Sequence, residues 1–202
     1  MRVEVNQEDI NRLKSDLRHI KNGMPLVVMR SINRVLTGVR TDFVNSVRRE
    51  YNVKAAAARG NITIHKASKN NISGAVESTG RPIPLVNFAP RPSNVQPRRK
   101  KAITVEVIRG ERKPLENAFI ALMPKKSADQ KKQHKGIFRR HKPPGKDRVG
   151  RLPIGELWGP RLEDYYSRSD VQAELQSGAE RRLSVEIDRQ ADYLFRQRMG
   201  ML

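Results

Sequence analysis

Lysine and arginine are the residues whose number and spacing most clearly suggest a chemical role in this chain. The 202 residues include 41 basic and 21 acidic side chains, which give a formal net charge of +20 and a pI near 10.9. Residues 97–151 alone hold 18 of the basic and 5 of the acidic side chains. Clustered cations bind phosphates, with an affinity that falls steeply as salt is added, or they dock on acidic proteins. The candidate contacts for DNA or an acidic partner are Arg98, Arg99, Lys100, Lys101, Lys125, Lys126, Lys131, Lys132, Lys135, Arg139, Arg140, Lys142, Lys146 and Arg148.

The aromatic content narrows the kind of polyanion that this cationic region could bind. Aromatic residues make up 5% of the chain, and Phe138 is the one ring between residues 125 and 148. Stacking on single-stranded bases needs several rings along the binding track, so that mode of binding is not favoured. Sequence-independent contact with phosphates and docking of a solvated basic loop on an acidic protein both remain open, because charge alone does not separate them.

Catalytic chemistry finds little support in the sequence. The chain has no cysteine, no G-x-S-x-G elbow and no G-x-x-x-x-G-K-[ST] phosphate loop. His19, His65, His134 and His141 show no metal-ligand spacing with a carboxylate, and we expect them to be solvated loop residues. Glu156 is the one carboxylate in an apolar motif, and a lone carboxylate does not make an acid–base pair. We therefore expect no enzyme, no cofactor and no metal site.

The first 60 residues are predicted to form a helical region. Asn6 can cap a helix that begins near Gln7 and stops at Asn22-Gly23, and Pro25 suits the first turn of a second helix that reaches about Glu50. An alanine-rich third helix would end at Gly60. The apolar residues of the first helix recur every three or four positions, at Ile10, Leu13, Leu17, Ile20 and Met24.

Residues 61–160 are predicted to be a β-rich core. Residues 62–64 and 72–76 read as a hairpin, 101–107 alternates as a strand, and 118–123 is an apolar run short enough for a buried strand. Five prolines predict an extended arm at residues 81–97. Residues 125–151 are predicted to form a basic loop. The arm's candidate contacts with a neighbouring subunit are Arg81, Pro82, Ile83, Pro84, Leu85 and Phe88.

The last third of the chain completes an α+β fold. Residues 152–160 are expected to form a compact apolar turn, and residues 161–202 a long C-terminal helix with Ser169-Asp170 as its cap. The N-terminal segment lacks the apolar core of a secretory signal, and no stretch approaches the ~20 apolar residues of a membrane span. We therefore expect assembly in a cytoplasm and no membrane partner.

Three segments, in this order, resemble the minor tail protein Z (tail completion) family of long-tailed bacteriophages. The first is residues 78–85 (STGRPIPL) with Phe88 following, the second joins 118–124 (AFIALMP) to 134–140 (HKGIFRR), and the third is 152–160 (LPIGELWGP). A helical N-terminal region and a charged C-terminal helix surround them, so the likeness extends over most of the chain. The departure is the insert 125–133, which is longer and more cationic than the family pattern.

The resemblance implies a structural virion protein that completes tails at the head–tail junction, the neck, with no catalytic residues to carry over. By analogy it also implies a ring, hexameric to match the tail, at the head-proximal end. The expected partners are other copies of the chain, the tail terminator, the tube and the head connector, with genomic double-stranded DNA in the channel. The alternative is a non-sequence-specific nucleic-acid-binding protein whose charge is its whole function.

Overall fold

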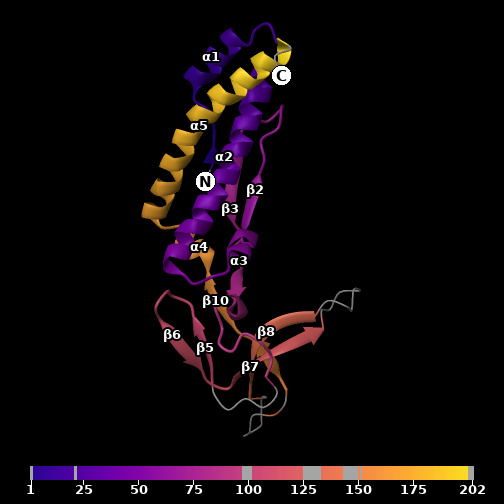
Figure 1. Cartoon of the computed structure of the whole chain (residues 1–202), viewed down its shortest axis with the longest axis vertical. Coiled ribbons are helices and arrows are strands. Elements are labelled where there is room, and N and C mark those ends of the chain that lie inside the picture. The colour runs from indigo at the N-terminus through magenta and orange to yellow at the C-terminus, as the bar shows by residue number, and fades with distance from the viewer. Residues whose placement is uncertain are drawn as a thin grey trace. The chain divides into compact units, whose positions relative to one another are not determined.

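The computed structural model describes residues 2–20, 22–96, 102–124, 133–142, 150 and 152–199, and it has the expected α+β class (Figure 1). The chain divides into two compact units. Unit 1 comprises residues 1–45, 59–79 and 163–202, and unit 2 comprises residues 46–58 and 80–162. The three consecutive regions expected from the sequence are therefore not the compact bodies of the fold, because the N-terminal helices belong with the C-terminal helix.

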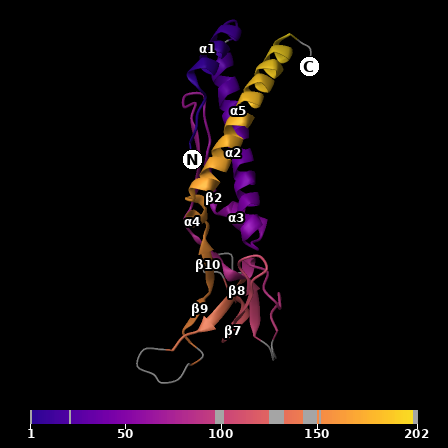
Figure 2. The same ribbon diagram turned by 90° about the vertical axis from the view of Figure 1, so that its left-hand side faces the viewer.

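Unit 1 is built on two long helices that lie side by side. These are α2 (Gly23–Glu50), whose last residues belong to unit 2, and α5 (Ser169–Arg198), which runs antiparallel beside it in both views (Figures 1 and 2). Both helices were predicted, but the N-cap of α5 is Arg168, without a side-chain hydrogen bond, and not the predicted Ser169-Asp170. The apolar stripe of each helix is buried, and the side chains that form this core include Ile32, Val35, Leu36, Val39, Phe43, Val171, Leu175, Ala179, Leu183 and Ile187.

The first helix, α1 (Gln7–Asp16), begins where the sequence placed it but ends earlier. The side chain of Asn6 accepts a hydrogen bond of 2.7 Å from the Asp9 backbone N–H, as an N-cap should. Leu17 follows as the C-cap with φ −101° and ψ 13°, and Asn22 has φ +58°. The predicted extension toward residue 22 is thus a tight turn, because a left-handed residue is needed to lead the chain back into α2.

A three-stranded antiparallel sheet packs in unit 1 with the order β1-β3-β2. Strands β2 (Ile62–His65) and β3 (Gly74–Ser78) form the predicted hairpin, and β1 (Arg2–Val3) is an addition too short to predict. A Cβ atom at Gly74 would lie 2.6 Å from Leu36 Cδ1, so β3 lies directly against α2. From the short helix α4 (Leu162–Tyr166), the Tyr166 hydroxyl donates a 3.0 Å hydrogen bond to the Val76 carbonyl. Burial raises the pKa of that hydroxyl, with a smaller contribution from the charge of Glu77.

Unit 2 contains the remaining strands, arranged in three small antiparallel sheets. Their orders are β10-β4, β5-β6 and β7-β8-β9. The backbone of Leu157 joins two of them, because its carbonyl accepts from Leu85 N at 3.0 Å and its N–H donates to Ile137 O at 2.8 Å. The elements are α3 (Ala55–Gly60), whose last two residues belong to unit 1, β4 (Pro82–Pro84), the 3₁₀ helix η1 (Leu85–Asn87), β5 (Ile103–Glu106), β6 (Arg112–Leu115), β7 (Ala118–Pro124), β8 (Gln133–Arg140), β9 (Ile154–Glu156) and β10 (Trp158–Arg161).

Two expectations for unit 2 were wrong in detail. Residues 152–160 are not one compact turn, because they supply β9 and most of β10. Glycines permit this close packing: a Cβ atom at Gly159 would lie 2.6 Å from a ring carbon of Phe88. The strand at 118–123 is confirmed but not buried throughout, since Ile120 is 7% exposed and Leu122 is 49% exposed.

Candidate polyanion-binding surface

The positive charge of the chain is divided very unequally between the two units. Unit 1 carries 17 basic and 14 acidic side chains, a net charge of +3. Unit 2 carries 24 basic and 7 acidic side chains, a net charge of +17. Nearly all of the excess therefore belongs to unit 2, which is the part of the chain that would attract a polyanion.

Strand β8, together with Lys142 two positions after its end, carries the predicted cationic contacts that the structure describes, and these four residues are called the cations of β8 below. Lys135 and Arg139 are partly exposed, and Arg140 and Lys142 are exposed. The predicted basic loop 125–151 therefore contains a strand, which is held by β7 on one side and by β9 on the other. The other predicted contacts lie outside the described residues; they are Arg98, Arg99, Lys100, Lys101, Lys125, Lys126, Lys131, Lys132, Lys146 and Arg148.

The side chains of β8 are partly held in place by neighbours. The Arg140 guanidinium carbon lies 5.3 Å from the centroid of the Phe119 ring, and Lys135 Nζ donates a 3.1 Å hydrogen bond to Asn94 Oδ1. Because successive residues of a strand point to opposite faces, Lys135 and Arg139 lie on one face and Arg140 on the other. The strand thus spreads its cations along its length and over both faces instead of collecting them in one flat patch.

A hydrogen-bonded side-chain pair that the sequence did not suggest lies beside these cations. His134 Nε2 is 2.7 Å from Glu156 Oε1, and the Glu156 side chain is 14% exposed. A Cβ atom at Gly136 would be 2.7 Å from the same oxygen, so this glycine leaves the space through which Glu156 reaches His134. The Phe138 ring meets the imidazole edge-on at 6.4 Å. Pairing of β8 with β9 brings the two side chains together across 22 positions, a separation without a local sequence signal.

The sequence predicted that all four histidines are solvated loop residues, and this prediction is wrong for two of them. His134 belongs to β8, and His65 belongs to β2, where its Nε2 lies 2.9 Å from Glu77 Oε2. Within the described ranges, no group of three or more histidine, aspartate or glutamate side chains is placed to hold a metal ion. The His134–Glu156 pair has the composition of an acid–base couple, and its visible effect is to join β8 to β9.

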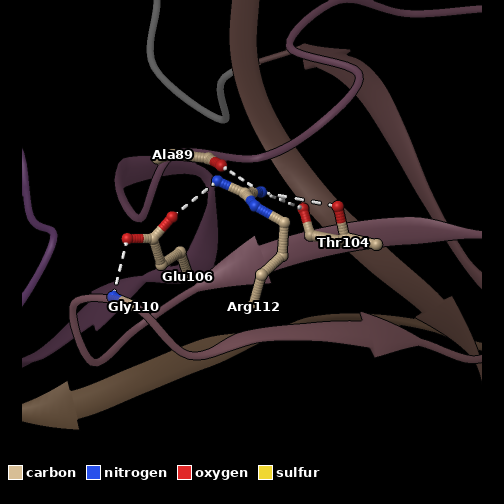
Figure 3. Close-up of polar contacts among 5 residues, drawn as sticks. All are labelled: Ala89, Thr104, Glu106, Gly110 and Arg112. Atoms are coloured by element: carbon tan, nitrogen blue, oxygen red, sulfur yellow. Dashed lines mark hydrogen bonds and ion pairs between the residues drawn. The ribbon is translucent and has the colours of Figure 1, made fainter.

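Arg112 is an example of a cation of unit 2 that the fold itself uses (Figure 3). Its Nη2 donates to Glu106 Oε2 at 2.9 Å, and its Nη1 donates to the Ala89 carbonyl at 2.9 Å. The Gly110 N–H donates to the other Glu106 oxygen at 3.1 Å. The Gly110 hydrogen bond, followed by that from Arg112, lowers the pKa of Glu106. Arg112 therefore fixes the β5–β6 hairpin to the segment at Ala89 and is not available to a polyanion.

The predicted arm is not a free subunit contact. Ile83 and Phe88 are 0% exposed and Leu85 is 8% exposed, so these side chains belong to the core of unit 2. Pro82 and Pro84, which are partly exposed, pair with β10, and Arg81 is exposed. Proline density excluded an α-helix correctly, although the segment contains the 3₁₀ turn η1. A proline-bounded edge strand can still pair on one side and bury its apolar residue.

A further helical feature was also missed by sequence reasoning. A groove of about 830 Å³ lies between α2 and α5 of unit 1, and its lining includes four arginines. The periodicity of each helix marks its buried face but not the opening that two neighbouring helices leave between them.

None of the helices in the described ranges has the length and apolarity to cross a membrane. No family model matches the chain, and no curated protein or solved structure matches it.

Proposed function

We propose that the chain is a structural protein of a tailed bacteriophage that acts in tail completion at the head–tail junction. In this proposal it is a subunit of a ring, hexameric to match the tail, at the head-proximal end. Its neighbours are the tail terminator, the tube and the head connector, and its location is the virion after assembly in the host cytoplasm. The observation that carries the proposal is the concentration of charge, +17 in unit 2 against +3 in unit 1.

This division of charge suits a protein in which one unit contacts neighbouring subunits and the other binds a polyanion. A ring around a DNA passage needs cations toward the phosphates and a nearly neutral body where copies of the same chain must approach one another. Unit 1 has the second property and unit 2 the first. The cations of β8 are partly ordered by Phe119 and Asn94, which reduces the side-chain entropy lost on binding.

The segments that carry the family resemblance also come together in space. Pro82–Pro84 from the first segment pairs with Trp158–Arg161, which begins in the third. Ile154–Glu156 from the third pairs with Gln133–Arg140 from the second. Segments so far apart in the chain thus form connected sheets of unit 2, which supports treating the three motifs as one structural feature.

A triple substitution among the cations of β8 tests the proposed polyanion contact. Lys135→Gln, Arg140→Gln and Lys142→Gln together should weaken binding to duplex DNA at least tenfold and reduce the slope of log K against log salt. The matched control changes three exposed cations of unit 1, Arg59, Lys66 and Lys69, to glutamine. Equal losses in both variants would contradict a role for β8.

The second candidate is a non-sequence-specific nucleic-acid-binding protein, favoured by the same charge of unit 2. Size-exclusion chromatography with light scattering, together with electron microscopy of the purified full chain, separates the two. Rings, or incorporation of the chain into phage tails, support the structural role. A monomer that binds duplex DNA in low salt and is absent from virions supports the alternative.

A further inference from the structure

The groove between α2 and α5 is a second potential binding surface, and it lies entirely within unit 1. It follows α2 from Arg34 to Asp42 and α5 from Gly178 to Arg189. At 1.5 Å of rise per residue, the α5 wall is roughly 17 Å long, about three turns of helix. Figure 2 shows the two helices that form its walls. Its length and shape therefore suit a short helical segment.

Two glycines account for the floor of the groove. A Cβ atom at Gly38 would lie 3.2 Å from Arg182 Nη1, and one at Gly178 would lie 3.6 Å from Asp42 Oδ2. Glycine weakens a helix interior relative to alanine, so its presence in both facing helices calls for a packing reason. The reason is the bidentate pair of Arg182 with Asp42, in which Nη2 lies 2.8 Å from Oδ1. Gly38 leaves room for the Arg182 side chain of this pair, whereas a Cβ atom at Gly178 would make only an ordinary van der Waals contact with Asp42.

The charges of the groove leave a cationic surplus. Its lining has four arginines and two carboxylates. Both carboxylates are already engaged, Asp42 by Arg182 and Glu186 by Gln190 at 2.8 Å and by Arg189 at 3.7 Å. Arg34 and Arg181 are exposed and form no ion pair within the described part of the chain. An anionic group entering the groove would therefore meet cations that intramolecular carboxylates have not neutralised.

An apolar side chain lies between the exposed arginines of α5. Val185 is 67% exposed, and Arg181 and Arg189 lie one helical turn before and after it. Residues four apart share a helix face, so the three form a stripe of cation, valine and cation. The two arginines are eight residues apart, which places their Cα atoms roughly 12 Å from each other along the axis.

Because of this stripe, a second copy of the chain is not expected to occupy the groove with the same face of its own α5. An antiparallel pairing of two α5 helices centred on Val185 would set Arg181 of one copy against Arg189 of the other. A parallel pairing would set each arginine against its own equivalent. Like charges in these positions repel. Phosphate backbones are also disfavoured, because Asp42 and Glu186 lie in the groove and Val185 presents an apolar surface at its rim.

We propose that the α2–α5 groove binds an acidic amphipathic helix of another protein. The matching helix carries two carboxylates seven or eight residues apart and an apolar residue midway between them on the same face. The carboxylates pair with Arg181 and with Arg189, whose side chain is 67% exposed and reaches Glu186 only at 3.7 Å. The apolar residue covers Val185, and Arg34 of α2 lies on the opposite wall. This site is separate from the cations of β8 and does not depend on the function proposed for them.

A designed peptide tests the groove in the full-length chain. The probe is a fluorescein-labelled, alanine-based helical peptide with glutamates at positions i and i+8 and leucine at i+4. We expect saturable binding by fluorescence anisotropy, and binding at least tenfold weaker for a peptide with glutamine in place of both glutamates. Equal binding of the two peptides would overturn the proposal.

Matched variants on α5 separate the groove from general electrostatic attraction. Arg181→Gln with Arg189→Gln should weaken the glutamate peptide at least tenfold. Arg196→Gln with Arg198→Gln removes the same charge from exposed positions outside the groove and should change binding less than twofold. Similar losses in both pairs would refute the site. Val185→Asp should also weaken binding while leaving the helical circular dichroism unchanged, and retention of full affinity would count against the proposal.

Two further measurements identify a different occupant. If Arg181→Gln with Arg189→Gln changes the mass of the protein in light scattering, the groove holds a second copy. If the same variant weakens duplex DNA binding as strongly as peptide binding, the groove is a nucleic-acid contact. Either result overturns the proposal, and neither bears on the triple variant of β8, so failure of the groove and failure of the β8 surface are distinguishable.

Discussion

The guanidinium of Arg112 shows how a single residue of a highly basic unit can be structural. It donates to the Ala89 carbonyl and to Glu106, while Gly110 holds the second carboxylate oxygen (Figure 3). A carboxylate with charged and backbone donors is favoured in its ionised form, which is why the pKa of Glu106 lies below its ordinary value of 4.5. The position of the residue in the fold, and not its charge, decides whether it is available to a ligand.

The lowered pKa of Glu106 predicts an acid-dependent loss of stability. A group whose pKa is lower in the folded state stabilises the fold above its unfolded pKa, and this contribution is lost as the pH falls through the folded pKa. Glu106→Gln should lower the melting temperature at pH 7 and reduce its dependence on pH below 4.5. Thermal unfolding followed by circular dichroism between pH 7 and 3 measures this. Glu116→Gln, at an exposed position, is the control and should retain the parent profile.

Gly136 predicts a steric effect at the His134–Glu156 pair. An added Cβ would lie 2.7 Å from Glu156 Oε1 and 2.8 Å from the Phe138 ring, and both neighbours are packed in the β7–β8–β9 sheet. Gly136→Ala should therefore cost about 1–3 kcal/mol of unfolding free energy. Urea denaturation measures it. Gly60→Ala, where nothing lies within 4 Å of the added atom, should stay within about 0.5 kcal/mol of the parent.

At the scale of the element, β7 shows that one strand can be buried at one end and exposed at the other. Ile120 is 7% exposed, whereas Leu122, near the end of β7 that pairs with the start of β8, is 49% exposed. We expect Ile120→Ala to cost roughly 2–5 kcal/mol by cavity formation, and Leu122→Ala to cost well under 1 kcal/mol. Chemical denaturation of the two variants checks this, and equal costs would show that the strand packs differently.

The elements that the sequence predicted well are those specified by local signals. The cap at Asn6, the long apolar stripes of α2 and α5, and the alternation at Ile62–His65 each lie within one segment. The strands at 154–161 were missed because they form through contacts with distant residues, Phe88 and Ile137, that no local pattern reveals. The same reason explains why Ile83 and Phe88 were assigned to an exposed arm.

The candidate site residues were likewise predicted where the signal lies within one segment and missed where it depends on distant partners. The cations of β8 were found because they lie within eight residues of one another in the sequence, whereas His134 and Glu156 meet only through the register of β8 with β9. The α2–α5 groove depends on which turns of two antiparallel helices face each other, so Gly38 and Gly178 carry no signal until the helices are paired. Composition identifies the charge, and tertiary pairing decides where it is presented.

At the scale of the whole molecule, the net charge of +17 in unit 2 predicts that salt stabilises the protein. Like charges repel within a compact body, and screening shortens the range of that repulsion from about 10 Å at 0.1 M salt to about 3 Å at 1 M. The melting temperature should rise between 0.05 and 0.5 M sodium chloride. Sucrose at the same osmolality is the control for effects that are not electrostatic, and a melting temperature that falls with salt would contradict the prediction.

The interleaving of the two units has a consequence for the order in which the protein is made. Unit 2 ends at residue 162, whereas unit 1 needs residues 163–202, which include α5. Ribosomes release the chain from its N-terminus, so unit 2 can be complete while α1 and α2 still lack the helix that covers them. The apolar face of α2 therefore lacks its covering helix until α5 has been made. A released chain truncated after residue 168 should be protease-resistant in unit 2 and sensitive in unit 1.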